Sequence, residues 1–182
     1  MEYKALPIEG VYLMEPRVFG DSRGYFMETF RSDEFRRRVA DIEFVQDNES
    51  LSGRGVARGL HYQAGDNSQA KLVRVTEGRV IDIVVDLRRG SGTFGRHLMV
   101  ELSEENHRML FLPHGMAHGF VTMAERNRFV YKVDRYYAPE SERTLLLTDP
   151  ALGIEWPVDT VNLTLSAKDL AGVPLSELTD LF

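Results

Sequence analysis

Residues Lys71–Asp86, KLVRVTEGRVIDIVVD, contain two apolar runs divided by a turn signal at Glu77-Gly78. Both runs are rich in Val, Ile and Leu, and each has the length of an ordinary strand. The stretch therefore predicts strands over Lys71–Val75 and Val80–Asp86 with a tight turn between them.

The same pattern continues on both sides of this stretch. Further strands are predicted at Val11–Met14, Tyr25–Phe30, Phe44–Gln46, Val56–Gln63, Leu98–Leu102, Met109–Leu112, Ala117–Thr122 and Phe129–Val133. Only two short helices are expected. One covers Ser32–Val39, with a serine cap, an acidic first turn and arginines near its end, and the other closes the chain near Ser166–Asp169. Many short strands with few helices indicate an all-β, jelly-roll-like fold, and no repeat or linker divides residues 1–182 into more than one domain.

The composition excludes several classes of function. The 182 residues include no cysteine, so disulfides and thiolate metal sites are excluded. A net charge of −6 argues against a nucleic-acid surface. No apolar run resembles a signal peptide or a membrane span, so we expect a cytoplasmic protein with no membrane partner.

Chemistry is suggested first by Gly53–Gln63, GRGVARGLHYQ, which reads as a strand with three glycines, two arginines and His61. Arginine binds phosphate as a planar fork, and histidine moves protons near neutral pH. The alternative is a twisted strand with solvated arginines and a core histidine. Arg58 and His61 are three positions apart, so a regular strand would point them to opposite faces. If both reach one ligand, we expect a bulge at Gly59.

The segment Pro113–Phe120 contains His114 and His118, and its Pro-x-Gly-x-x-His pattern is similar to the second half of a metal-binding cupin site. Such sites also need a His-x-His pair on an earlier strand. The corresponding residues here are His61-Tyr62-Gln63, which lack the second histidine. No metal site is therefore expected.

Several other residues have two readings when each is taken alone. Tyr131, within a strand, is either a core residue with a bonded hydroxyl or a general acid. Tyr136 and Tyr137 follow at the end of that strand, where a ring could stack on a base. Lys71, Lys168 and Asp169 are unremarkable in isolation.

Taken in order, these segments resemble one known family. The matching segments are Asp21–Glu28, Gln46–Ser50, Arg58–Gln63, Lys71–Val75, Pro113–Phe120, Tyr131-Lys132 and Asp149-Pro150. Their order and spacing are similar to those of the dTDP-4-dehydrorhamnose 3,5-epimerases, which are cupin-fold enzymes. The resemblance runs from about Arg23 to Lys168.

The resemblance implies a reaction and a set of roles. The family removes a proton beside the ketone of a nucleotide-linked 4-keto sugar and returns one on the opposite face. By resemblance His61 is the base, Tyr131 the acid, Asp169 the partner that orients His61, and Lys71 the group that stabilises charge on the keto oxygen. The implied substrate-binding residues are Arg23, Glu28, Gln46, Asn48, Arg58, His118, Tyr137, Glu142 and Lys168, with Arg58 on the diphosphate, His118 along the sugar pocket and Tyr137 stacked on thymine. No metal or organic cofactor is expected.

The resemblance also implies a homodimer in which Arg23 and Glu28 complete the site of the partner subunit. Ala70 stands where the family commonly has glycine, and Thr144–Thr148 replaces a run that often contains tryptophan and asparagine. Inversion at C3 alone or C5 alone, or of another nucleotide sugar, therefore stays open. The other readings are a nucleotide-sugar 3,4-ketoisomerase, a sugar-binding cupin without activity and a metal-dependent cupin dioxygenase.

Overall fold

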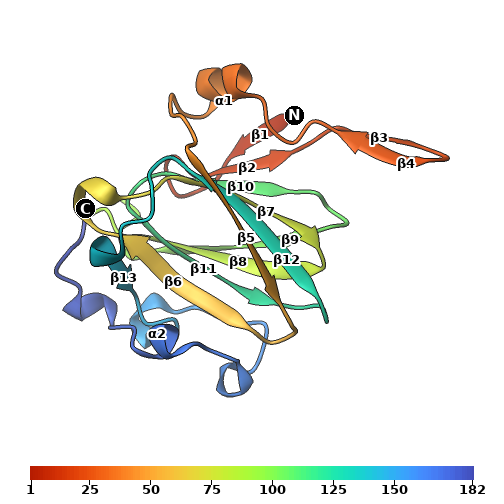
Figure 1. Ribbon diagram of the computed structural model, residues 1–182. Helices are drawn as coiled ribbons and strands as arrows, with labels where there is room; N and C mark the ends of the chain where they lie inside the picture. The colour runs from red at the N-terminus through yellow and green to blue at the C-terminus, as the bar shows by residue number, and fades with distance from the viewer.

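The computed structural model describes all 182 residues, and it consists mainly of antiparallel strands (Figure 1). One sheet has the order β1 (Glu2–Ala5), β2 (Tyr12–Glu15), β10 (Met109–Leu112), β7 (Lys71–Glu77), β12 (Asn127–Val133) and β5 (Gln46–Ser52). The other has the order β13 (Glu142–Thr144), β6 (Ala57–Gln63), β11 (Met116–Thr122), β8 (Arg79–Asp86) and β9 (His97–Ser103). Strands β3 (Val18–Asp21) and β4 (Gly24–Met27) form a separate hairpin that extends away from both sheets (Figure 1).

The helices are short. They are α1 (Ser32–Arg38), α2 (Ala167–Leu170) and the 3₁₀ turns Gly65–Asn67, Pro139–Ser141, Pro150–Leu152, Thr160–Asn162 and Leu175–Glu177. None is long and apolar enough to cross a membrane. The predicted serine cap of α1 is wrong, because Arg31 occupies the cap position and Ser32 is already helical. The helix is held instead by Phe35, which is fully buried and meets the ring of Phe111 edge-on.

The two sheets pack face to face around an apolar layer. Val73, Val75 and Phe129 of the first sheet pack with Val84 and Phe120 of the second. Because side chains alternate along a strand, β8 turns Val84 to this layer and Ile83 to the opposite face. The predicted all-β, jelly-roll class is confirmed by this arrangement of two facing antiparallel sheets.

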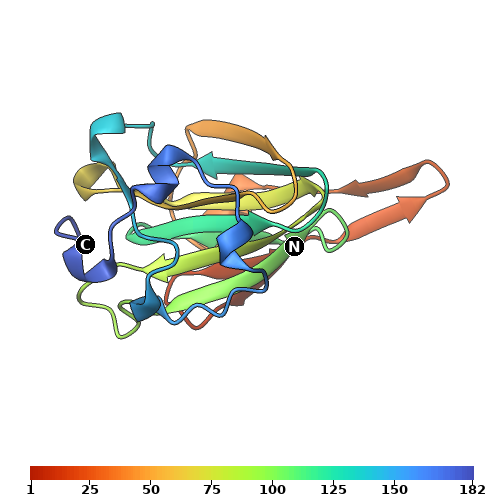
Figure 2. The same ribbon diagram turned by 90° about the horizontal axis from the view of Figure 1, so that it is seen from below.

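The chain after β13 covers the outer face of the second sheet, as Figure 2 shows. Leu152 and Leu178 of this segment join a buried cluster with Leu60, Ile83 and Val85. The segment therefore acts as a third layer built from turns. Its one α-helix, α2, lies where a closing helix is predicted, and it is close to β6.

Most predicted strands match observed ones within two residues, but two predicted strands differ and three observed strands are not predicted. The strand predicted at Phe44–Gln46 is wrong, since β5 begins at Gln46 and continues to Ser52. Its polar residues alternate between half-buried and exposed, so no apolar pattern marks it, and pairing with β12 defines it. The predicted strand over Tyr25–Phe30 ends early, at Met27. Strands β1, β3 and β13 are not predicted at all, because none of them is a run of apolar residues.

The bulge predicted at Gly59 is confirmed. His118 pairs with His61 and Phe120 pairs with Arg58, so β6 places two residues opposite the single residue Gly119 of β11. Gly59 has φ 121°, a conformation open to glycine. The extra residue turns Arg58 and His61 toward the same cavity, and both line it.

Replacing Gly59 by alanine is expected to destabilise the fold by about 2–4 kcal/mol, because the positive φ alone costs about 1–3 kcal/mol for other residues. The added Cβ would also lie 2.6 Å from Cα of Gly119 and 2.7 Å from the carbonyl oxygen of His118. Denaturant unfolding measures the loss. Gly53→Ala is the control, since its Cβ meets nothing within 4 Å. Equal unfolding midpoints for Gly59→Ala and wild type would contradict the packing described here.

Candidate active site

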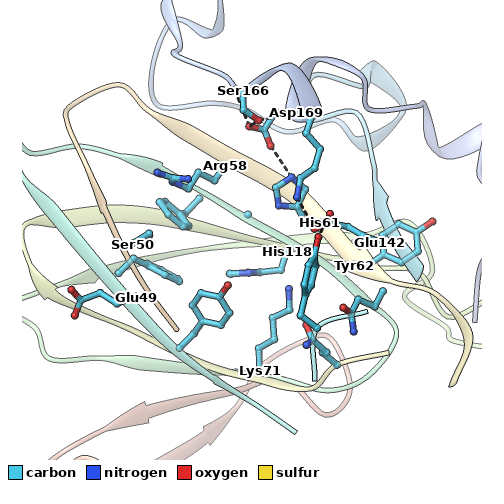
Figure 3. Close-up of a pocket in the computed structure, with 18 residues that line it drawn as sticks. Glu49, Ser50, Arg58, His61, Tyr62, Lys71, His118, Glu142, Ser166 and Asp169 are labelled. Carbon is cyan, nitrogen blue, oxygen red and sulfur yellow. Dashed lines mark hydrogen bonds and ion pairs between the residues drawn. The ribbon is translucent and has the colours of Figure 1, made fainter. Parts of the chain in front are cut away.

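A cavity of about 320 Å³ lies between the two sheets and is bordered by the C-terminal segment (Figure 3). It is lined by residues of β5, β6, β7, β11, β12 and α2 and of the chain around β13. Its volume is that of a small-molecule site. Nine of the thirteen predicted site residues line it: Arg58, His61, Lys71, His118, Tyr131, Tyr137, Glu142, Lys168 and Asp169.

His61 lies beside a buried carboxylate (Figure 3). Its Nε2 is 2.7 Å from Oδ1 of Asp169, at ion-pair distance but without the alignment of a regular hydrogen bond. Burial, followed by the positive charge of Lys168, lowers the pKa of His61 to about 4, against the opposing effect of Asp169. The imidazole is therefore neutral at pH 7 and able to accept a proton.

Asp169 is 4% exposed and is held by backbone and side-chain donors. Oδ1 accepts a hydrogen bond from the Gly59 N–H at 3.0 Å, and Oδ2 accepts from the Ser166 N–H at 3.0 Å and the Ser166 hydroxyl at 2.6 Å. Burial acts to raise the pKa of Asp169, but these hydrogen bonds outweigh it, and the pKa is lowered. The carboxylate is therefore ionised beside His61 at neutral pH.

Ser166 is a site residue that the sequence analysis did not identify. Its side chain accepts from the Asp169 N–H, while Asp169 accepts from the Ser166 N–H, which makes a capping box at the start of α2. The Ser-x-x-acid spacing was the available signal. The cap of a four-residue helix thus fixes the carboxylate that contacts the histidine.

Lys71 points into the cavity from the opposite sheet (Figure 3). The residue is 9% exposed, and burial lowers its pKa to about 8, while Asp82 and Glu142 oppose the shift. The Lys71 side chain is therefore mostly protonated at pH 7, and its charge is weakly solvated. A positive charge in such a position stabilises negative charge that develops on a bound ligand.

Tyr131 lines the cavity from β12 and is partly buried. Burial, with a further effect of Glu142, raises its pKa. The phenol therefore keeps its proton at neutral pH, as a general acid must. Its ring packs against the core cluster that contains Phe129, and the residue also lines the cavity.

His118 pairs with a second buried aspartate. Nε2 of His118 and Oδ2 of Asp82 are 2.9 Å apart, and the two residues are 8% and 0% exposed. Burial raises the pKa of Asp82, although His118 opposes the shift. Asp82 was not predicted, since its β8 strand reads as an apolar run in which one acid carries no signal. The pair fixes the His118 ring in the cavity wall.

The outer part of the cavity carries a chain of polar contacts. The Tyr137 hydroxyl donates to Glu142 Oε2 at 2.9 Å, and Lys168 Nζ donates to Glu142 Oε1 at 2.6 Å. Burial acts to raise the pKa of Glu142, but the bonds from Lys168 and Tyr137 outweigh it and lower the pKa. Arg58, on the far side of the bulge, donates from Nε to Ser52 Oγ at 3.2 Å and keeps its terminal nitrogens for other partners.

Four predicted site residues are not in the cavity lining. Arg23 lies in the turn of the β3–β4 hairpin, where it pairs with Asp21, and Glu28 follows β4 on the surface. Gln46 and Asn48 lie on β5, and Gln46 Nε2 donates to Asn48 Oδ1 at 2.8 Å. Gln46 is near the cavity through its Oε1, which accepts from the Tyr137 N–H at 3.3 Å.

Three of the five histidines each pair with a single aspartate. Besides the pairs of His61 and His118, His114 Nε2 lies 2.6 Å from Asp134 Oδ2, outside the cavity lining. The structure gathers no group of three or more His, Asp or Glu side chains that could hold a metal ion. Gln63, at the position where a metal-binding cupin has its second histidine, makes hydrogen bonds to backbone groups instead.

Comparison with known proteins identifies relatives of this chain in sequence and in fold. The family model described as dTDP-4-dehydrorhamnose 3,5-epimerase matches residues 5–177. The enzyme of that name from Neisseria gonorrhoeae is 52% identical over 168 residues, which cover 92% of this chain, and the chain spans only 50% of that relative's length. The enzyme of the same name from Salmonella typhimurium is 48% identical over 171 residues, which cover 93% of each chain.

Solved structures of epimerases have the same fold as this chain. The 3,5-epimerase from Legionella pneumophila, solved with dTDP-4-keto-L-rhamnose, has a TM-score of 0.93 and 42% identity, and the match covers 97% of this chain and 94% of that one. A 3'-monoepimerase from Streptomyces bikiniensis, solved with dTDP-quinovose, has a TM-score of 0.88 and 35% identity, with coverage of 94% and 86%. Both the fold and the sequence resemblance are confirmed, and the chain belongs to the dTDP-4-dehydrorhamnose 3,5-epimerase family of isomerases.

Proposed function

We propose that the protein epimerises C3 and C5 of dTDP-4-keto-6-deoxyglucose without a cofactor, in dTDP-L-rhamnose biosynthesis. The observation that carries the proposal is His61 Nε2 at 2.7 Å from Asp169 Oδ1, in the same cavity as Lys71 and Tyr131. His61 and Tyr131 come from facing sheets, so a sugar bound between them has the base on one face and the acid on the other, as inversion requires. Relatives bound to dTDP-sugars support the nucleotide.

The first half of the reaction is carbanion formation. His61 accepts the proton from the carbon beside the ketone, and the C–H electron pair moves into an enolate on the keto oxygen. Asp169 stabilises the imidazolium that forms, because an opposite charge lies 2.7 Å away. Lys71 stabilises the enolate oxygen.

The second half returns a proton to the opposite face. The enolate collapses to the ketone as the carbon takes a proton from the Tyr131 hydroxyl, which leaves a tyrosinate. Exchange with solvent then restores the phenol and the neutral imidazole. The same cycle at the second carbon completes the epimerisation, and at each carbon one C–H bond breaks and one forms.

The remaining residues bind the substrate in this proposal. Arg58 binds the diphosphate, since its guanidinium has free donors at the rim, and Tyr137, 52% exposed, stacks on the base. Glu142 and Lys168, which also line the cavity, contact the substrate in this proposal. His118 lines the sugar end beside Phe129.

We also propose a homodimer, in which the β3–β4 hairpin reaches the site of a second copy. The hairpin extends away from its own sheets (Figure 1) and exposes Phe19, Tyr25 and Phe26 by 51%, 61% and 71%. Aromatic side chains so exposed are characteristic of an interaction surface. Arg23 and Glu28 of this hairpin region would then contact the substrate bound by the partner, along with Gln46 and Asn48 of the recipient.

Solvent exchange tests the reaction directly. Incubation with dTDP-4-keto-6-deoxyglucose in deuterated water is expected to place deuterium at both C3 and C5, as located by NMR, because each inversion returns a solvent-derived proton. Label at one carbon would indicate a monofunctional epimerase, and absence of label would contradict the proposal.

His61→Asn should reduce label at both carbons by roughly 10²–10⁴-fold, the usual contribution of an acid–base group, with dTDP binding retained. Tyr131→Phe should slow inversion similarly, and full epimerase activity in this variant would return Tyr131 to the role of a core residue.

The pH dependence of kcat/KM should be bell-shaped. His61 accepts a proton only when neutral, so activity falls as the pH drops through its pKa of about 4. Lys71 acts as a cation, so activity falls as the pH rises through its pKa of about 8. In Lys71→Arg the residual kcat/KM should not decrease at alkaline pH, because arginine stays protonated. An alkaline limb at the same pH in that variant would assign it to another group.

The homodimer is tested by light scattering of the purified protein, with twice the chain mass of 20.8 kDa expected. Phe26→Ser should shift the mass toward the monomer and reduce turnover together, because the hairpin serves both. Leu170→Ser, an exposed apolar residue on α2 far from the hairpin in sequence, is the control and should leave the mass unchanged. A fully active monomeric wild type would contradict the dimer.

A further inference from the structure

Gln63 is a buried amide whose hydrogen-bonding groups are all used on the backbone. The residue ends β6 and is 4% exposed. Its Nε2 donates to the carbonyl oxygen of Asn67 at 2.7 Å and that of Tyr136 at 3.3 Å, and its Oε1 accepts from the Ala138 N–H at 2.7 Å. The bonds to Tyr136 and Ala138 connect β6 to a segment more than 70 residues further along the chain.

The segment held by Gln63 carries Tyr137. Between the end of β12 and the start of β13 the chain has no ladder to order it, and Tyr137 is 52% exposed. Gln63 bonds the residue before Tyr137 through its carbonyl and the residue after it through its N–H. The Tyr137 N–H itself donates to Oε1 of Gln46, a residue of β5. The amide of Gln63 is therefore the one side chain that brackets Tyr137.

Gln63 also lies two residues beyond His61 on one strand, and both line the cavity. At Gln63 the strand is paired with Glu142, which accepts the Tyr137 hydroxyl. One strand thus carries both the imidazole of His61 and the side chain that anchors the segment around Tyr137. Rigid support of this kind fixes the distance between two groups that contact one ligand.

We propose that Gln63 is a positioning residue that acts through Tyr137: it fixes the 136–138 backbone so that the Tyr137 ring meets the nucleotide end of the substrate while His61 meets the sugar. The inference rests on the proposed function, since it takes dTDP as the group that Tyr137 contacts. In this proposal Gln63, which stands where a metal-binding cupin has its second histidine, contributes to substrate affinity.

The test is dTDP binding by calorimetry, together with the steady-state kinetics of the full-length protein. Gln63→Met keeps the length of the side chain and removes all three bonds, and it should raise the Kd for dTDP and the KM by about tenfold while kcat changes by less than about twofold. Gln63→Glu keeps the acceptor for Ala138 but places a carboxylate against two carbonyl oxygens, and it should shift both constants in the same direction. This second variant decides the matter if Gln63→Met does not fold.

A double-mutant cycle separates positioning from general support. In a Tyr137→Ala background, Gln63→Met should have no further effect on the Kd, because the residue through which it acts is gone. Ser141→Ala is the matched control. It removes the nearby bond that Asn67 Nδ2 donates to Ser141 Oγ at 2.8 Å without touching residues 136–138, and it should bind dTDP as wild type does.

Unchanged dTDP binding in folded Gln63→Met and Gln63→Glu would overturn this inference and leave the proposed function standing. Equal effects of Gln63→Met with and without Tyr137 would do the same. A wild-type protein that binds no dTDP would overturn both this inference and the proposed substrate.

Discussion

The close approach of β6 and β11 at Gly59 and Gly119 is the constraint on which the site depends. A Cβ on Gly59 would lie 2.6 Å from Cα of Gly119, and one on Gly119 would lie 2.4 Å from the carbonyl oxygen of Arg58. Only a pair of residues without side chains permits this contact. The extra residue of β6 that it accommodates turns Arg58 and His61 to one cavity and leaves the Gly59 N–H free to donate to Asp169. One backbone irregularity therefore aims the side chains and orients the carboxylate.

Burial then sets the chemistry of the groups that the bulge brings together. Removal from water disfavours the charged form of each, so His61 is neutral, Lys71 has a lowered pKa and Tyr131 keeps its proton. Asp169 is the exception, because donors from two segments stabilise its charge. The result is a neutral imidazole, a lysine cation and a protonated phenol in one cavity, which are the protonation states that the proposed enolate chemistry needs.

The C-terminal layer links stability to this chemistry. Leu152 and Leu178 cover the outer face of the second sheet, and the same segment brings α2 to β6. The capping box at Ser166 holds Asp169 at the start of that helix. Apolar burial over the whole tail thus holds a four-residue helix that would not form alone, since isolated helices of that length are unstable in water.

Much of this protein follows from local sequence. Apolar runs such as Val80–Asp86, divided by Gly-containing turns, determined the strands and the all-β class, because strand length and side-chain alternation are local properties. The spacing of Arg58 and His61 required a bulge if both met one ligand, and Gly59 was the residue able to form it. The ordered motifs of the sequence also indicated the family. Strand β5, the Asp82–His118 pair and the backbone bonds of Gln63 were decided only by the tertiary structure. Each of these is a contact between polar groups distant in the chain, and a polar residue carries no local sign of the partner it meets when two sheets pack together.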